Sequence, residues 1–271
     1  MNSKSTKPCM DNSGNAADAQ PPTEPVGFCA SPEAEVTQGL QRYLDTLAAL
    51  HDHFQPDVYL EIGIRHGVSL ALANRSRVAV GIDPAPELRA ALADHVRVIS
   101  MTSDQFFDGS PMAILGEPVN LAFIDGMHLF EFALRDFMNV ERHATANSII
   151  VFDDIFPNHP LQAERERQSG VWTGDVWKIV PCLRKYRPDL LLFPLDAHPA
   201  GLLVVANLDP CSQVLRANYR SIVDEFTSTT APALESRTLS RAGALAPNDP
   251  QLFDFIDRLK RAQHASHAIH S

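Results

Sequence analysis

The apolar residues in the central part of the chain fall into short continuous runs that alternate with amphipathic stretches. The runs cover residues 58–62, 78–82, 96–99, 119–124 and 148–152. The stretches between them, in which we expect helices, cover residues 69–74, 86–94, 103–115 and 129–143. Continuously apolar strands that alternate with helices are typical of a parallel sheet covered on both faces. The pattern therefore predicts a doubly wound α/β fold.

The alternation of apolar runs and amphipathic stretches ends after residue 152. A polar, irregular stretch at 156–174 precedes an expected helix at 175–186, and two more apolar runs follow at 190–195 and 202–206. The segment 196–201 between these runs is long enough for a hairpin and too short for a helical crossover. We therefore expect a seven-stranded sheet, mostly parallel, with an antiparallel hairpin at its end. A dinucleotide-binding domain normally ends in a sixth parallel strand instead.

The two ends of the chain differ from this core. Residues 1–28 are rich in Ser, Asn, Pro and Ala and have almost no large apolar side chains, so we expect a disordered tail. Ser31 and Pro32 suit the start of a helix, and apolar residues continue at helical spacing from Val36 to Leu50.

Beyond residue 210, amphipathic stretches at 213–226 and 252–259 predict two further helices. The predicted organisation has three parts, namely the tail at 1–28, an α/β domain at 29–210 and a helical extension at 211–271.

Composition narrows the class of partner. The 271 residues carry a formal net charge of −10, and 45% of them are hydrophobic. Such an acidic chain repels nucleic acid and anionic membranes, so we expect neither as a partner. We find no bilayer-spanning run, no secretion signal and no C-x-x-C spacing among the four cysteines, which predicts a cytoplasmic location with reduced thiols. A small-molecule partner remains, and a homo-oligomer is compatible with the sequence.

The first apolar run leads into a loop that contains two glycines. Glu61 is followed by Gly63, Gly67 and Ser69, a Gly-x-x-x-Gly spacing that differs from the Gly-x-Gly-x-x-Gly of pyrophosphate-binding loops. Glycines at this place allow a tight turn and the close approach of a ligand, and the next helix offers its N-terminus to a carboxylate. Asp83, after the second run, can accept both ribose hydroxyls of a nucleoside. Singly, these residues also fit tight packing and a helix cap, but together they predict a cofactor site.

Three acids follow the fourth and fifth runs. Asp125 comes directly after residue 124, and Asp153 and Asp154 come directly after residue 152. The carboxyl ends of parallel strands share one edge of the sheet, so these carboxylates converge beside the cofactor loop. Crowded carboxylates raise one another's pKa, and a hard divalent cation such as Mg²⁺ relieves the repulsion. The sequence therefore predicts a metal site, with helix capping by each acid as the alternative.

His128 lies three residues after Asp125, and these two are the predicted catalytic residues. A histidine suits proton abstraction near neutral pH, although a supporting or capping role is also open. Residues 156–178 follow the acids directly and have the length of a lid or substrate wall. Within this segment we expect Trp172 to contact substrate and Trp177 to anchor the following helix in the core.

The glycine loop, the acid after the second run and the acids after the fourth and fifth runs resemble the metal-dependent O-methyltransferases related to catechol O-methyltransferase. The likeness is greatest to the bacterial branch that contains the macrolide-sugar O-methyltransferases, and it covers roughly residues 56–207. It implies a class I fold and the cofactor S-adenosylmethionine. It also implies a hydroxylated small-molecule acceptor, such as a sugar. Residues 29–210 thus become a predicted methyltransferase domain.

The resemblance also implies residue roles. Gly63 and Gly67 would shape the cofactor loop, Glu61 would orient the loop or the methionine moiety, and Ser69 would meet the methionine carboxylate. Asp83 would hold the ribose. The adenine contacts implied by the family fall on Ser103 and Asp104. One departure is Met127, which stands where relatives often carry a second acid.

Other functions stay open at this point. A metal-independent methyltransferase with His128 as its base would need the same residues without the cation. An NAD-dependent oxidoreductase is disfavoured by the glycine spacing and the terminal hairpin. A non-catalytic binding module with the same fold stays open, because fold alone does not determine function. The row of acids disfavours it.

Overall fold

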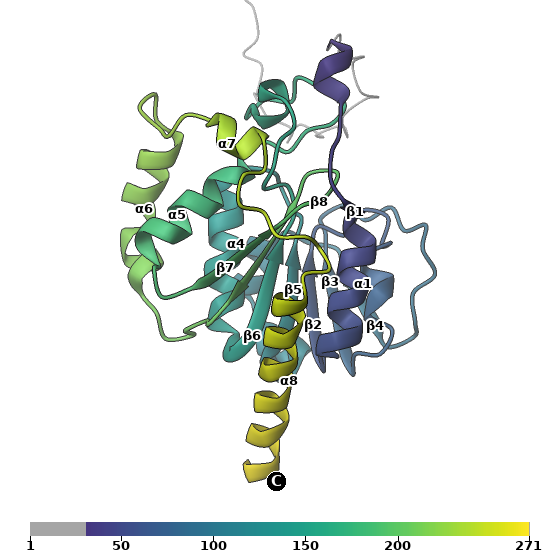
Figure 1. Cartoon of the computed structure of the whole chain (residues 1–271). Coiled ribbons are helices and arrows are strands. Elements are labelled where there is room, and N and C mark those ends of the chain that lie inside the picture. Colours follow the sequence, from purple (N-terminus) through teal and green to yellow (C-terminus); the bar gives the residue numbers. More distant parts are fainter. Residues whose placement is uncertain (1–30, 271) are drawn as a thin grey trace, which may run out of the picture.

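The structure, a computed structural model, describes residues 31–270. The predicted tail at 1–28 lies outside the described residues. The centre of the fold is a seven-stranded sheet with the order β4-β3-β2-β5-β6-β9-β7 (Figure 1). Its strands are β2 (Val58–Ile62), β3 (Val78–Ile82), β4 (Val96–Ile99), β5 (Val119–Ile124), β6 (Ala144–Phe152), β7 (Leu191–Leu195) and β9 (Leu202–Ala206).

The directions of the strands confirm the predicted sheet. β2 pairs in parallel with β3 and β5, and β5 pairs in parallel with β6. β9 runs antiparallel to both β6 and β7, so the sheet ends in the expected hairpin. Strands β2 and β5 are buried at every position, because both faces of the sheet are covered by helices.

Each face of the sheet has its own apolar core. One core joins the strands to α4 (Phe130–Arg142), α5 (Ile179–Tyr186) and α6 (Val214–Thr227). The other joins them to α1 (Tyr43–Phe54) and α8 (Pro250–His270), which lie together across the front of the sheet in Figure 1. The two helices that the sequence predicts beyond residue 210, α6 and α8, thus pack against the predicted methyltransferase domain. No described helix combines the length and apolar character needed to cross a bilayer.

The predicted first helix is wrong at its start. Residues Pro32–Glu35 form one turn of 3-10 helix, η1, and α1 begins only at Tyr43. Between them, Gly39 has a φ of 138° and lies against the backbone of residues 197–198. The short strand β1 (Gln41–Arg42) pairs there with β8 (Ala197–His198). A backbone that only glycine readily adopts therefore interrupts the helical spacing.

The expected helix at 86–94 is also wrong. This segment has no regular structure, and its amides donate to the cofactor loop: Glu87 N to Arg65 O and Arg89 N to His66 O. Pro84 and Pro86 offer no amide hydrogens and disfavour a helical conformation in the residue before each of them. The expected helices at 69–74 and 103–115 appear as the 3-10 turn η2 (Leu70–Ala73) and as two short helices, α2 (Ser103–Asp108) and α3 (Pro111–Leu115).

Candidate active site

The three strand-end acids lie at one edge of the sheet, as the topology requires. Ile124, the last residue of β5, is the register partner of Phe152, the last residue of β6. Asp125 N donates to Ile62 O at 2.8 Å, and Asp153 N donates to Ile124 O at 3.1 Å. The strand pairing therefore continues into the acids and brings them together beside the end of β2.

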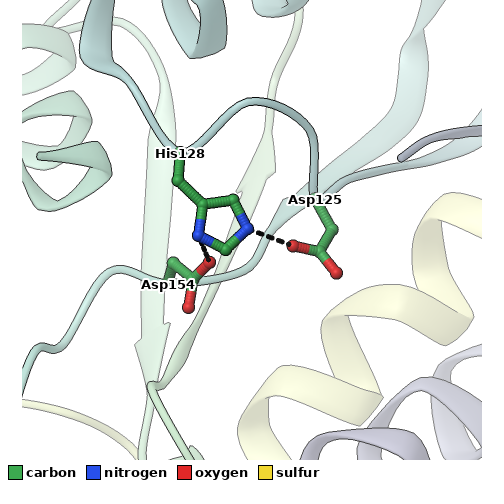
Figure 2. A group of neighbouring side chains, drawn as sticks. All are labelled: Asp125, His128 and Asp154. Carbon is green, nitrogen blue, oxygen red and sulfur yellow. Dashed lines mark ion pairs between the residues drawn. The ribbon is translucent and has the colours of Figure 1, made fainter. Parts of the chain in front are cut away.

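His128 lies between two of these acids (Figure 2). Its Nε2 is 3.3 Å from Oδ1 of Asp125, and its Nδ1 is 3.1 Å from Oδ2 of Asp154. Potential ligand atoms of these three residues all lie within 4.8 Å of one another. Asp153 adjoins the group, but its Oδ1 accepts the amide of Asp154 at 2.8 Å. The geometric cluster thus contains His128 where the sequence prediction of the metal ligands had Asp153.

The electrostatics of the cluster favour positive charge. Burial, together with the charges of Asp154 and Asp125, raises the pKa of Asp153 well above its ordinary range. Burial also raises the pKa of Asp154 to about 7, although the charge of His128 opposes this. Burial lowers the pKa of His128, but Asp154 and Asp125 outweigh that effect and raise the pKa to about 10. A cation between the acids therefore removes the cost of their mutual repulsion.

The backbone of the cluster adopts conformations that are uncommon for these residue types. His128 has a φ of 50° and Asp154 a φ of 64°, both in the left-handed region. Gly174, with a φ of 56°, packs directly against the carbonyl group of His128. A Cβ at position 174 would be 2.9 Å from the carbonyl carbon of His128 and closer still to its oxygen. Only glycine fits there, so residue 174 sets the position of the histidine.

The part of segment 156–178 from Trp172 to Val176 lies beside the cluster, and its role as a lid or substrate wall stays a prediction. The ring of Trp172 stacks on His128 with centroids 5.2 Å apart, and its carbonyl oxygen is 2.9 Å from His128 Nδ1. Trp177 is buried, as predicted for a core anchor. Asp175 accepts the amide of Phe130 at 2.8 Å and therefore caps α4. Asp125 does not provide this cap, so its carboxylate is available to the site.

The cofactor loop is held by a buried carboxylate. Glu61 accepts the hydroxyls of Tyr59 at 2.7 Å and Ser69 at 2.6 Å, and burial raises the pKa of Glu61 to about 8. Two predicted cofactor residues, Glu61 and Ser69, therefore contact each other. Gly63 has a φ of 83° and packs against the backbone of Asp125, which joins the loop to the acids.

Asp83 and Gly67 hold the outer part of the same loop. Oδ2 of Asp83 accepts the amides of Ile64 at 3.0 Å and Arg65 at 2.8 Å. Gly67 has a φ of 71°, and a Cβ there would meet the side chain of Leu88 at 3.0 Å. Asp83 therefore organises the loop in addition to the ribose contact predicted for it.

The two predicted adenine contacts lie on α2, each beside a residue of α4. Asp104 forms a bidentate pair with Arg135, at 2.9 and 2.7 Å. Near Ser103 lies Asp136, a buried carboxylate whose pKa burial raises to about 7, although Ser103 opposes this shift. Oδ1 of Asp136 has no hydrogen-bond partner among the described residues. Sequence reasoning missed Asp136, although a carboxylate on the apolar face of the expected helix at 129–143 was a usable signal.

A small cavity of about 10 Å³ lies among these groups. It is lined by Asp125, His128, Asp136, Asp153 and Asp154, and it has room for about one water-sized group. Five titratable side chains, four of them carboxylates, thus line one small cavity at the carboxyl edge of the sheet.

Residues 60–155 match the model of a protein family described as a methyltransferase domain. No curated protein matches the sequence. Among solved structures, an O-methyltransferase from Bacillus cereus in complex with SAH is 15% identical, with a TM-score of 0.49, and the match covers 66% of this chain and 82% of that one. TomG, an O-methyltransferase from Streptomyces achromogenes in complex with SAM, is 16% identical with a TM-score of 0.47, and the match covers 62% of this chain and 80% of that one.

The methyltransferase MycE, solved with Mg and SAH, is 18% identical with a TM-score of 0.41, and the match covers 63% of this chain but only 49% of MycE. These likenesses are too distant to carry an argument about chemistry. The strand order confirms the predicted fold, and the family match over residues 60–155 supports the predicted methyltransferase activity. The reaction must be argued from the residues of this chain.

Proposed function

We propose that the chain is an S-adenosylmethionine-dependent methyltransferase of the class I fold, and that it methylates a hydroxyl group of a small molecule with the help of a divalent cation. The observation that carries this proposal is the convergence of Asp125, His128 and Asp154 within 4.8 Å at the carboxyl edge of the sheet. The acceptor is a hydroxylated compound of the sugar class, as the resemblance of the motifs implies.

The residues present fit a divalent cation. The cavity between them is the size of one water, and its walls are rich in carboxylates. Asp136, whose Oδ1 has no partner among the described residues, is one of the lining residues. Asp125, Asp153 and Asp154 would hold the ion, since carboxylate oxygens are the ligands that Mg²⁺ prefers. When bound, such an ion supplies Lewis acidity that lowers the pKa of the acceptor hydroxyl.

The cofactor would lie between the loop at 63–69 and Asp83, with Ser103 and Asp104 at its adenine end. Gly63 contacts the backbone of Asp125, so the cofactor loop adjoins the acids. Methyl transfer requires the attacking oxygen in line with the sulfur–methyl bond at near-contact distance, and the adjacency of the two sites supports this arrangement.

His128 is the proposed proton acceptor. The carbonyl oxygen of Trp172 lies 2.9 Å from Nδ1, which favours a proton on that nitrogen. Nε2 pairs with Asp125, and the charges of Asp125 and Asp154 raise the pKa of the imidazole. A cation bound to these acids would offset their charge, lower this pKa and release Nε2 for the acceptor hydroxyl. The indole of Trp172 covers the other side of the imidazole and excludes water. We expect His128→Ala to lower kcat by about 10²–10⁴-fold with cofactor affinity unchanged. Wild-type turnover in this variant would leave His128 with a structural role only.

Metal dependence is the direct test. We expect methyl transfer to a panel of sugars and phenols to stop in EDTA and to return with Mg²⁺ or Mn²⁺. Asp154→Asn should raise the metal concentration needed for half-maximal rate, whereas Asp108→Asn, an exposed acid on α2, should leave it unchanged. Circular dichroism of each sample checks that the fold is retained.

A metal-independent methyltransferase is the second candidate, and one observation favours it. The imidazole of His128 itself bridges Asp125 and Asp154, where it balances their charge. Full turnover of the folded enzyme in EDTA would reject the metal-dependent mechanism and support this one. Binding of S-adenosylhomocysteine is expected under both candidates, so its absence would count against the methyltransferase function as a whole.

A further inference from the structure

A second and much larger cavity lies away from the acids. It has a volume of about 390 Å³ and lies between α5 and the segment 232–242, which carries α7 (Ser236–Leu239) (Figure 1). Cavities of this size hold small molecules. Ile155 and Phe156, which directly follow Asp154, form part of its wall and are both buried. This cavity shares no lining residue with the small cavity at the acids.

The walls of this cavity are largely apolar and incompletely packed. Trp177, Val180 and Pro181 line it from the α5 side, and Pro232 and Ala233 line it from the opposite side. The apolar residues of the opposite wall have only short side chains, and α7 has no buried residue. The segment therefore borders the cavity without filling it. An apolar ligand body would cover surface that the chain itself leaves open.

The charges at the cavity are mainly positive. Arg184, Lys185 and Arg237 line it, against a single acid, Glu235. Lys185 pairs with Glu225 at 2.7 Å, and Arg237 is 4.0 Å from Glu235. Arg184 is exposed and forms no ion pair with any residue between 31 and 270. In a chain with a net charge of −10, this local excess of positive charge is complementary to an anion.

We propose that the cavity between α5 and the segment 232–242 binds an amphipathic anion, with an aromatic or aliphatic body against Trp177 and Pro181 and a carboxylate or phosphate at Arg184. The size, the open apolar walls and the charge are independent observations that agree on this ligand class. The site is separate from the methyl-transfer site, so the proposal does not depend on the acceptor or on the metal.

Three small probes of similar shape test the charge requirement. We choose 2-naphthoate as the carboxylate, 1-naphthyl phosphate as the phosphate and 2-naphthamide as the neutral counterpart. The chain has two tryptophans, so in Trp172→Phe the remaining Trp177 reports on the cavity by its fluorescence. We expect at least one anion to quench this fluorescence and to bind about tenfold more tightly than the amide, as measured by calorimetry. The stronger of the two anions identifies the head group.

Two variants locate the binding. Arg184→Gln should remove most of the preference for the anion, whereas Arg220→Gln, an exposed arginine of α6 outside the cavity, should leave it intact. Ala233→Trp fills the space from an exposed position and should abolish binding of every probe. Equal affinity for amide and anions, equal effects of the two arginine variants, or no binding of either anion at millimolar concentration would overturn the proposal.

Discussion

Gly174→Ala separates the positioning of His128 from the general stability of the lid. The glycine has a φ of 56° and is in contact with the carbonyl group of His128. It cannot retreat easily, because the carbonyl oxygen of Gln162 accepts the amides of both Thr173 and Gly174, at 2.9 and 3.0 Å. Gln162 is itself fully buried. An added methyl group should therefore displace His128 and leave the lid backbone in place.

The loss of folding free energy expected for Gly174→Ala has two parts. A non-glycine residue in the left-handed conformation costs roughly 1–2 kcal/mol of folding free energy. The overlap adds about 1–3 kcal/mol, as in other overpacked sites. The carbonyl carbon of His128 would lie 2.9 Å from the new Cβ, and the carbonyl oxygen would lie closer still. Real carbon contacts need about 3.5–4 Å, so the carbonyl group must move by at least about 1 Å. A displacement of that size can reduce the rate by about 10²-fold.

Gly116→Ala is the matched control. Gly116 ends α3 with a φ of 74°, and a Cβ there would meet nothing within 4 Å. Both variants carry the backbone strain, but only Gly174→Ala carries the overlap. Urea unfolding gives the free energies, and the methyl-transfer assay gives kcat/KM for both. If Gly174→Ala keeps the kcat/KM of Gly116→Ala, then residue 174 does not position the histidine and the reasoning fails.

Two further predictions concern the fold and the cofactor loop. Burial lowers the pKa of His51 from 6.5 to about 4, so the unfolded chain binds the extra proton first as the pH falls. The stability that this neutral histidine contributes is complete above pH 6.5 and is lost as the pH falls toward 4. Over this range the free energy of unfolding should fall by about 3 kcal/mol relative to that of His51→Phe. If urea unfolding shows the same pH dependence for both proteins, the prediction is wrong. Asp83→Ala should weaken binding of S-adenosylhomocysteine at least tenfold, because each lost hydrogen bond to ribose is worth roughly 1.5–3 kcal/mol. Wild-type affinity by calorimetry would remove Asp83 from the cofactor site.

The sequence by itself determined the sheet and the place of its chemistry. The short apolar runs predicted the buried strands, because a strand covered on both faces has few other compositions available to it. The convergence of Asp125, Asp153 and Asp154 also followed from sequence alone, because the carboxyl ends of adjacent parallel strands must share an edge.

Local spacing failed where the chain makes distant contacts. Val36 and Leu40 fit a helical pattern, but both are exposed, because Gly39 packs against residues 197–198 and the helix starts later. The segment 86–94 has a partly helical composition, but the hydrogen bonds of its amides to the cofactor loop hold its backbone in an irregular conformation.

Only the tertiary structure decided how the acids are used and supported. It placed His128 between Asp125 and Asp154, put Gly174 under the carbonyl group of His128, and gave Asp175 the cap of α4, a role that sequence left open for Asp125. It also created the cavity beside α5. Periodicity specifies which face of an element is buried, but contacts between residues far apart in the chain depend on how the elements pack.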